Sequence, residues 1–329
     1  MKNGIDVGIA SVGHCLPEQV VKNEFFTRFV ETSDEWIRQR TGIEERRWIR
    51  DGERPSDLFV KAGQMALERA GLEPGDIDLI VLGTVSGDFM LPSTACIVQE
   101  RMGCRNAAAF DVLAACTGFL YALGVGHQFI TSGRYRNVLV MGGEALSRIC
   151  DHYDRNSVVL FADGAGAAVL QPHDACGQGL IEDFTLSSNG SGWHYIYRPA
   201  GGGAVPMTPE VLNEGDYLVR IKGREVYRFA IAKMTELMEW AMKGQDPADL
   251  GMVFPHQMNA RILETAASKL SIPRDKIFIN IKKTGNTSAG SVPIGLSEAW
   301  AAGTLEKGKF LILAAFGAGL TWGAARVRW

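Results

Sequence analysis

A repeat within the chain is the feature that most limits how it can fold. The segment 71–81 (Gly-Leu-Glu-Pro-Gly-Asp-Ile-Asp-Leu-Ile-Val) resembles the segment 244–254 (Gly-Gln-Asp-Pro-Ala-Asp-Leu-Gly-Met-Val-Phe). In each segment we expect a helix to end, a turn containing proline to follow, and an apolar strand to begin. Segments 132–134 and 302–304 each precede a further strand and lie 170 residues apart, whereas segments 71–81 and 244–254 lie 173 residues apart. The pattern indicates a duplicated fold, although two unrelated strand–helix–strand units would also resemble each other.

The order of the expected elements indicates an α/β fold. The chain has 329 residues, enough to bury a sizeable core in one large or two ordinary domains. Strands alternate with helices, which is typical of α/β folds with a buried sheet, and the repeat divides the chain into halves 1–171 and 172–329. The expected strands are 5–13, 76–83, 107–112, 137–142, 166–170, 252–255 and 277–281, and the expected helices are 32–40, 55–70, 93–102, 118–131 and 292–301.

Cys116 lies where the strand 107–112, expected to be buried, gives way to the apolar helix 118–131. A cysteine at a helix N-terminus meets unpaired N–H groups and the positive end of the helix dipole, and both favour the nucleophilic thiolate. The alternative is a structural cysteine, because cysteine is among the most frequently buried residues. Asn286 lies 170 residues further on, also between a strand and a helix. In a duplicated fold such junctions meet, so we expect Cys116 and Asn286 to face each other.

His256 and a glycine-rich turn add to this pair. His256 directly follows the strand 252–255, at a strand end where α/β proteins build their sites. A single histidine there is more often structural, but with Cys116 and Asn286 it completes a Cys–His–Asn set. The turn within 316–323 allows the backbone N–H of Ala318 to join that of Cys116 in an oxyanion hole.

Other patterns exclude several kinds of site and partner. The glycines of 164–166 and 201–203 match neither a dinucleotide nor a phosphate motif, and we assign both segments to turns. The net charge of −3 gives no indication of nucleic acid or an anionic membrane. Six cysteines without paired spacing argue against zinc and against a disulfide framework. The N-terminus lacks a signal peptide pattern, and the apolar run 310–322 is too short to span a bilayer. We expect a soluble cytoplasmic protein.

Six motifs, in order, make the whole chain resemble the β-ketoacyl-acyl carrier protein synthase III family of the thiolase superfamily. The resemblance implies a thiolase-like α/β fold, in which two pseudo-symmetric halves form a five-layered αβαβα sandwich. The motifs are Thr-Ser-Asp-Glu-Trp-Ile-x-x-Arg-Thr-Gly-Ile (32–43), Ala-Ala-Cys-Thr-Gly-Phe (114–119), Asp-Gly-Ala-Gly-Ala (163–167), Pro-His-Gln-x-Asn-x-Arg-Ile (255–262), Gly-Asn-Thr-Ser-Ala (285–289) and Phe-Gly-x-Gly-x-Thr-Trp-Gly (316–323).

The resemblance also implies a decarboxylative Claisen condensation without a cofactor. Cys116 would take an acyl group from acyl-CoA, and malonyl-acyl carrier protein would then lose CO2 and attack the acyl-cysteine. The enolate oxygen would receive hydrogen bonds from neutral His256 and from Asn286, each worth about 3–4 kcal/mol of the barrier. Phe316 would disfavour the malonyl carboxylate by keeping water out, and the acyl carbonyl would lie between the N–H groups of Cys116 and Ala318.

Binding residues are implied in the same way. Trp36 and Arg155 match residues that sandwich the CoA adenine, Thr32 and Arg40 match polar contacts nearby, and Asn259 matches a pantetheine contact. A homodimer is implied, with the apolar segment 91–110 at its interface. The acidic carrier protein would dock on the basic residues Arg228, Arg261 and Lys269. The alternative is that these three residues form a solvated charged face.

The sequence departs from the family pattern at three positions and leaves alternatives open. Ser268 replaces a frequent lysine, Arg224 replaces an asparagine, and Leu91 replaces a large aromatic residue that caps the partner's acyl pocket. Leu91 therefore leaves the length of the acyl chain open. The alternatives are a synthase III-like acyltransferase of a polyketide or quinolone type pathway and a Cys–His–Asn thioester hydrolase. A degradative thiolase would need a second cysteine in the turn 317–319, which lacks one.

Overall fold

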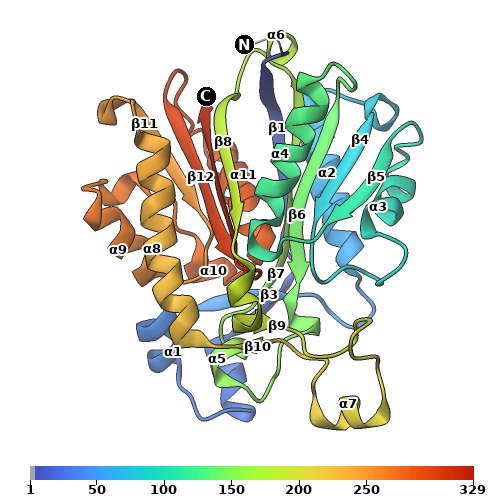
Figure 1. Ribbon diagram of the computed structural model, residues 1–329, viewed down its shortest axis with the longest axis vertical. Helices are drawn as coiled ribbons and strands as arrows, with labels where there is room; N and C mark the ends of the chain where they lie inside the picture. Colours follow the sequence, from blue (N-terminus) through green and yellow to red (C-terminus); the bar gives the residue numbers. More distant parts are fainter. Residues whose placement is uncertain (1–3) are drawn as a thin grey trace.

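The computed structural model describes residues 4–329, and two sets of strands form its centre (Figure 1). Within the described residues, one nine-stranded sheet runs in the order β11-β12-β13-β8-β1-β7-β6-β4-β5. The ladder between β8 and β1 consists of the pair Leu180 and Gly8, so the sheet is only weakly continuous there. The strands are β1 (Val7–Cys15), β4 (Leu79–Gly83), β5 (Ala108–Val112), β6 (Val138–Ala145), β7 (Asp163–Pro172), β8 (Leu180–Ser188), β11 (Leu250–Pro255), β12 (Phe310–Gly317) and β13 (Thr321–Arg328).

The two sets repeat one arrangement, which confirms the predicted duplication of the fold. In the first set, β4 pairs in parallel with β5 and β6, and β6, β7 and β1 then pair antiparallel. In the second set, β11 pairs in parallel with β12, and β12, β13 and β8 pair antiparallel. Ile277 forms a parallel bridge to Val253 of β11 and takes the place of β5. The boundary between residues 171 and 172, at the end of β7, stays a prediction.

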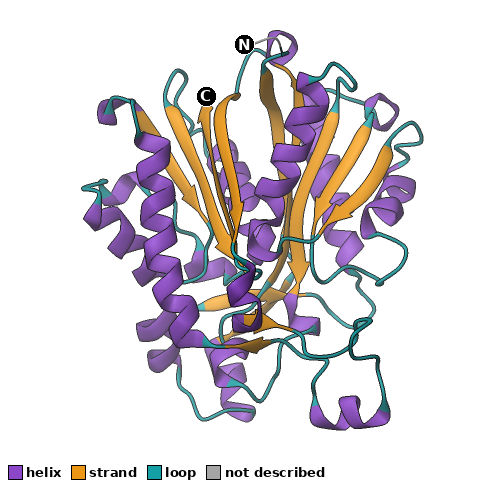
Figure 2. Ribbon diagram, viewed as in Figure 1, coloured by secondary structure: helices purple, strands orange, loops and turns teal. Residues whose placement is uncertain are grey.

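Helices complete the five-layered αβαβα sandwich (Figures 1 and 2). The middle layer is α4 with α11, which contact strands of both sets. On the outer face of the first set, α2 and α3 pack on strands β1, β4, β5, β6 and β7, and α8 with α9 covers the second set. Apolar side chains fill each interface, as burial of the apolar face of a helix requires. These helices are α2 (Pro55–Ala70), α3 (Thr94–Met102), α4 (Gly118–Thr131), α8 (Gly223–Met242), α9 (Ala260–Lys269) and α11 (Ser291–Ala301).

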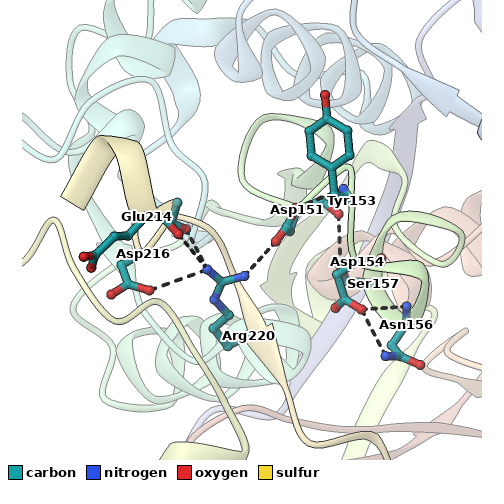
Figure 3. A network of polar contacts seen from close by, with 9 residues as sticks. Asp151, Tyr153, Asp154, Asn156, Ser157, Glu214, Asp216 and Arg220 are labelled. Atoms are coloured by element: carbon teal, nitrogen blue, oxygen red, sulfur yellow. Dashed lines mark hydrogen bonds and ion pairs between the residues drawn. The ribbon is translucent and has the colours of Figure 1, made fainter. Parts of the chain in front are cut away.

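Short elements gather below the sheets in Figure 1 and surround the junctions at that end. In Figure 3, Arg220 links two of their loops, because its guanidinium lies 2.7 Å from an Asp151 oxygen and 3.5 Å from an Asp216 oxygen. This link fixes the loop after α7 to the loop before α5. The elements below the sheets are β2 (Gln19–Lys22), α1 (Asp34–Thr41), β3 (Glu45–Trp48), α5 (Arg155–Val158), β9 (Ile196–Tyr197), α7 (Pro209–Glu214), β10 (Arg220–Ile221) and α10 (Ile281–Thr284). The short helix α6 (His173–Cys176) lies at the opposite end, next to β1.

Three local predictions are wrong. Residues 277–281 form a single bridge rather than a strand, because α10 begins at Ile281. Gly164 and Gly166 lie within β7 rather than in a turn: a Cβ on Gly166 would come within 2.7 Å of Pro293, so glycine is needed where α11 crosses the strand. The strand β5 is half-exposed rather than buried, because it lies at the sheet edge and pairs with β4 alone among the described strands.

A helix needs about 20 consecutive, mainly apolar residues to cross a bilayer. Among residues 4–329, no helix meets this requirement.

Candidate active site

Cys116 lies in a 3₁₀ turn (Ala115–Thr117) that joins β5 to α4. Ala115 adopts φ 45°, a left-handed conformation that non-glycine residues rarely take, and this reverses the chain just before the cysteine. The Thr117 hydroxyl bonds the Ala114 carbonyl (2.6 Å) and lies 2.7 Å from the Thr321 hydroxyl. The turn is thereby tied to the start of β13. A Cβ on Gly317 would lie 2.8 Å from the Cys116 nitrogen, so glycine at the end of β12 allows close approach.

The Cys116 thiol is neutral in the resting protein at pH 7. Burial raises its pKa to about 12, and the nearby Glu144 carboxylate raises it further, although hydrogen bonds from Ser288 and its own backbone lower it. Part of the residue surface stays accessible. A helix N-terminus favours the thiolate, but loss of hydration on burial has the larger, opposite effect on the pKa of this thiol. The nucleophile needs a group that accepts its proton.

His256 follows β11 and is fully buried. Its backbone N–H donates to the Ala314 carbonyl (2.7 Å), which holds the residue against β12. Burial lowers the pKa of the imidazole to about 3, so the ring is neutral, as a hydrogen-bond donor to an enolate requires. The ring nitrogen Nδ1 lies 2.9 Å from the Ser291 hydroxyl, whereas Nε2 is buried without a partner among the described residues.

The Ser291 hydroxyl governs which ring nitrogen of His256 carries the proton. Its single proton has two acceptors within reach, His256 Nδ1 and the Ser288 carbonyl oxygen at 2.8 Å. When the hydroxyl donates to Nδ1, the ring proton is on Nε2, which is the unpartnered nitrogen. The role implied for His256 requires this tautomer.

Asn286 is fixed by its own backbone. Its N–H donates to the Leu160 carbonyl (3.0 Å) and its carbonyl accepts from Ala162 (2.9 Å). Its Oδ1 accepts from the Ser288 N–H (2.9 Å). Within the described chain, the Nδ2 amide has no protein acceptor, so its two N–H bonds are available to a substrate.

Ser288 connects the three predicted residues, and sequence reasoning missed it. Its hydroxyl lies 3.3 Å from Cys116 Sγ, its N–H donates to Asn286 Oδ1, and its carbonyl oxygen lies 2.8 Å from the hydroxyl of Ser291, the partner of His256. It has φ 50°, the same left-handed conformation as Ala115. The structure therefore brings Cys116, Asn286 and His256 around one residue. The sequence signal was its place in the motif 285–289, in which only Asn286 was predicted to have a role.

The predicted pairing of Cys116 with Asn286 as equivalent positions is wrong, although the two junctions do meet. The left-handed residue is at 115 in one junction and at 288 in the other, and the α-helix begins at 118 and at 291. Both comparisons give an offset of 173, so Cys116 corresponds to Ala289. The offset of 170 holds elsewhere in the chain but not here, because the two halves differ in loop length.

Glu144 is the second residue that sequence reasoning missed. It lies near the end of β6, is 1% exposed, and accepts hydrogen bonds from Thr84 Oγ1 (2.9 Å), Val85 N (3.0 Å) and Ser86 Oγ (2.5 Å). Its Oε1 lies 3.5 Å from the Ser288 hydroxyl. Burial raises the pKa of this carboxyl to about 7, against the effect of its hydrogen bonds. A glutamate within the apolar run 138–145 was the available signal.

The predicted pocket residues are divided between two places. Phe316 is 2% exposed, and its ring lies 5.6 Å from that of His256, edge to face. Ala318 begins the turn that follows Gly317, the residue packed on Cys116. Leu91, in contrast, is 87% exposed on the surface of this chain. The structure of one chain therefore does not bring Leu91 to the cysteine.

The predicted adenine-binding residues form one cluster. The Arg155 guanidinium lies 4.6 Å above the centre of the Trp36 ring, and that of Arg40 lies 5.9 Å from it. Asn259 begins α9 and donates to the Arg40 carbonyl (2.9 Å). The Thr32 hydroxyl is buried without a partner among the described residues. A purine between Trp36 and Arg155 needs about 7 Å, two van der Waals contacts, so the pair must separate to admit it.

The predicted basic residues lie along α8 and α9. A surface hollow of about 520 Å3 is lined by Arg40, Gly223, Arg224, Tyr227, Arg228, Asn259 and Arg261. An adjoining one of about 480 Å3 includes Arg261 and Lys269. Arg40 and Asn259 therefore belong both to the Trp36 cluster and to this basic surface. Arg224 and Tyr227 are lining residues that sequence reasoning did not assign to binding.

Metal ligation has no support in residues 4–329. No group of three or more His, Cys, Asp or Glu side chains there is placed to hold an ion. The absence of a cofactor stays a prediction.

Comparisons with known proteins agree on one family. Residues 110–190 match the family described as 3-oxoacyl-[acyl-carrier-protein (ACP)] synthase III, and residues 241–329 match its C-terminal part. A β-ketoacyl-[acyl-carrier-protein] synthase III of Caldanaerobacter subterraneus subsp. tengcongensis is 45% identical over 99% of this chain and 98% of its own length. The crystal structure of 3-oxoacyl-[acyl-carrier-protein] synthase III from Aquifex aeolicus is 39% identical, with a TM-score of 0.90, over 98% of this chain and 100% of that one.

A further solved structure comes from a different kind of pathway. The priming β-ketosynthase from the R1128 polyketide biosynthetic pathway is 29% identical, with a TM-score of 0.88, over 100% of this chain and 98% of that one. Identity is thus lower than to the Caldanaerobacter and Aquifex synthase III proteins. The chain belongs to the β-ketoacyl-acyl carrier protein synthase III family of the thiolase superfamily.

Proposed function

We propose that the protein condenses an acyl-CoA starter with malonyl-acyl carrier protein in fatty acid synthesis, through an acyl-cysteine on Cys116. One observation carries the proposal: Ser288 joins the cysteine, Asn286 and, through Ser291, a neutral His256. A thiol next to two neutral donors suits a reaction that first holds an acyl group and then stabilises an enolate oxygen.

The two half-reactions use different parts of the site. In the first, Cys116 Sγ forms a thioester with the acyl carbon while the bond to the CoA sulfur breaks. In the second, loss of CO2 from the malonyl group leaves an enolate, whose oxygen receives hydrogen bonds from His256 Nε2 and Asn286 Nδ2. The enolate carbon then attacks the acyl carbon, and Cys116 leaves as the β-ketoacyl product forms. The dry surroundings of Phe316 favour loss of the charged carboxylate.

The substrate-binding roles are part of the same proposal. Trp36 and Arg155 take the adenine ring after they separate, and Thr32, Arg40 and Asn259 supply polar contacts. The basic surface with Arg228, Arg261 and Lys269 receives the acidic carrier protein, since opposite charge steers such an encounter.

A homodimer is also proposed. Exposed apolar side chains precede α3 and follow β5. They expose more apolar surface than so short a stretch of a monomeric protein normally does. The strand β5 leaves one edge unpaired among the described strands. Leu91 would then contact the partner's acyl pocket. The exposed side chains are Phe89 (57%), Met90 (82%), Leu91 (87%) and Leu113 (83%).

The decisive experiment separates the two half-reactions by mass spectrometry. The protein is incubated with a panel of acyl-CoA starters, and the acyl group on Cys116 is located in a tryptic peptide. Malonyl-acyl carrier protein is then added, and β-ketoacyl-carrier protein is measured. A lasting acyl-cysteine that disappears only on addition of the malonyl substrate is expected. Prompt hydrolysis of the acyl-cysteine by water would instead indicate the thioester hydrolase.

A further inference from the structure

A path of polar groups leads from the nucleophile into the protein. It runs from Cys116 Sγ to Ser288 Oγ (3.3 Å) and from there to Glu144 Oε1 (3.5 Å). The residues come from the first-half junction, the second-half junction and β6, so only the folded chain assembles the path. A buried carboxylate costs free energy unless its surroundings stabilise it, and this one lies directly behind the nucleophile.

We infer that Ser288 and Glu144 accept the proton that the Cys116 thiol loses when it attacks the acyl-CoA thioester. The inference deepens the proposed function and rests on it. Ser288 touches the reacting sulfur and is a catalytic residue in this step. Glu144 acts through Ser288 and is a positioning residue that holds the proton.

The thiol needs such an acceptor, and His256 is unsuited to the task. Burial keeps Cys116 protonated at neutral pH, because it raises the pKa of the thiol to about 12. His256 Nδ1 is engaged with the Ser291 hydroxyl, and burial lowers the pKa of the ring to about 3, so it is a weak base. Burial raises the pKa of the Glu144 carboxyl to about 7, which suits a group that takes up and returns a proton.

The geometry around Glu144 directs the proton to one of its oxygens. The loop after β4 supplies three donors to Oε2, from Thr84, Val85 and Ser86, and the Val85 N–H also reaches Oε1 (3.2 Å). The Ser288 hydroxyl approaches Oε1. The elements packed on the carboxyl thus present hydroxyls and N–H groups, and the charge of Glu144 raises the pKa of the Cys116 thiol.

The transfer conserves protons and charge. The thiol proton moves to Ser288 Oγ as the Ser288 proton moves to Glu144 Oε1, and the thiolate attacks the acyl carbon. The bond between that carbon and the CoA sulfur breaks, and the CoA thiolate takes the proton back along the same hydroxyl. Glu144 is again a carboxylate, and the products are acyl-Cys116 and CoA thiol. The hydroxyl proton of serine rotates freely enough to serve both directions.

The test is the rate of a single acylation turnover as a function of pH. Wild-type protein, Glu144→Gln and Ser288→Ala are mixed with acyl-CoA between pH 5.5 and 9.5, quenched rapidly, and scored for acyl-Cys116 by mass spectrometry. We expect both variants to acylate about 100-fold more slowly than wild type at pH 7.5, in the range of general base catalysis. The acylation rate of the wild type should fall as the pH drops below 7, and this break in the pH profile should be absent from Glu144→Gln.

A matched control keeps the two proposals distinguishable. Asp163→Asn makes the same change at another buried carboxyl, which accepts from Ile49 and Ser147 rather than from the nucleophile junction. Its acylation rate and pH profile should match wild type, with thermal unfolding recorded for every variant. Wild-type rates and an unchanged break in folded Glu144→Gln or Ser288→Ala would overturn the inference. Failure of the wild type to acylate at all would overturn the proposed function instead.

Discussion

The two strand-to-helix junctions share a backbone but differ in burial. Each has a left-handed residue, Ala115 or Ser288, then a 3₁₀ turn and an apolar helix. Residues 284–297 of the second junction are buried throughout, whereas Leu113 of the first is 83% exposed and Cys116 keeps accessible surface. The junction with the nucleophile is open because two substrates must reach it. The one with Asn286 is closed because donors to an enolate act best when fixed and dry.

The largest expected effect is at the open junction. Cys116→Ala removes the sulfur that forms the acyl-enzyme, so acylation and overall condensation should both be lost completely. Intact-mass spectrometry after incubation with acyl-CoA measures the first, and formation of β-ketoacyl-carrier protein measures the second. Acylation at any other residue of the variant would show that the nucleophile is misassigned.

The two proposed donors to the enolate, His256 and Asn286, should affect the second half-reaction alone. His256→Ala or Asn286→Ala removes one donor to the enolate oxygen, which should slow condensation about 100- to 1000-fold, equivalent to about 3–4 kcal/mol. Acylation should stay within about threefold of wild type. Pre-acylated protein mixed with malonyl-carrier protein isolates the step, and full condensation rates in either variant would contradict the division of roles.

The two half-reactions, acylation and condensation, should also respond differently to pH. The Glu144 carboxyl has a pKa of about 7, so below that pH it is protonated and cannot accept the thiol proton, and acylation should slow about tenfold per pH unit. His256 has a pKa of about 3 and stays neutral, so condensation by pre-acylated protein should be flat from pH 5 to 8. Stopped single-turnover assays of each step check this. Parallel pH profiles for the two steps would contradict it.

The smallest effect is expected outside both junctions. Leu91→Phe enlarges a side chain that, in the proposed dimer, lies against the partner's acyl pocket. The preferred starter should become shorter, by about tenfold in relative rate for one methylene, because a filled pocket rejects the longer chain. The starter panel measures it, and Met90→Phe, at an 82% exposed neighbouring position, is the matched control. An unchanged chain-length profile would remove Leu91 from the pocket.

The sequence by itself determined the architecture. The repeated turns 71–81 and 244–254 predicted two copies of one fold, and the helices at 55–70 and 118–131 agree with α2 and α4 residue for residue. These succeed because helix periodicity and turn chemistry are local properties of the chain. The motifs also placed Cys116, His256 and Asn286 at junctions that the structure brings together.

Only the tertiary structure decided how those residues are supported. Ser288 and Glu144 stand 144 positions apart and meet behind the thiol, and no local pattern encodes such a contact. The pKa of Cys116 depends on long-range packing in the same way: a helix end is visible in the sequence, but desolvation depends on everything packed around the sulfur. Likewise, the Arg155 guanidinium on α5 stacks on the Trp36 ring of α1. The half-exposure of β5 follows from its place at the sheet edge. Long-range packing sets the chemistry of this site, within a frame that local sequence defines.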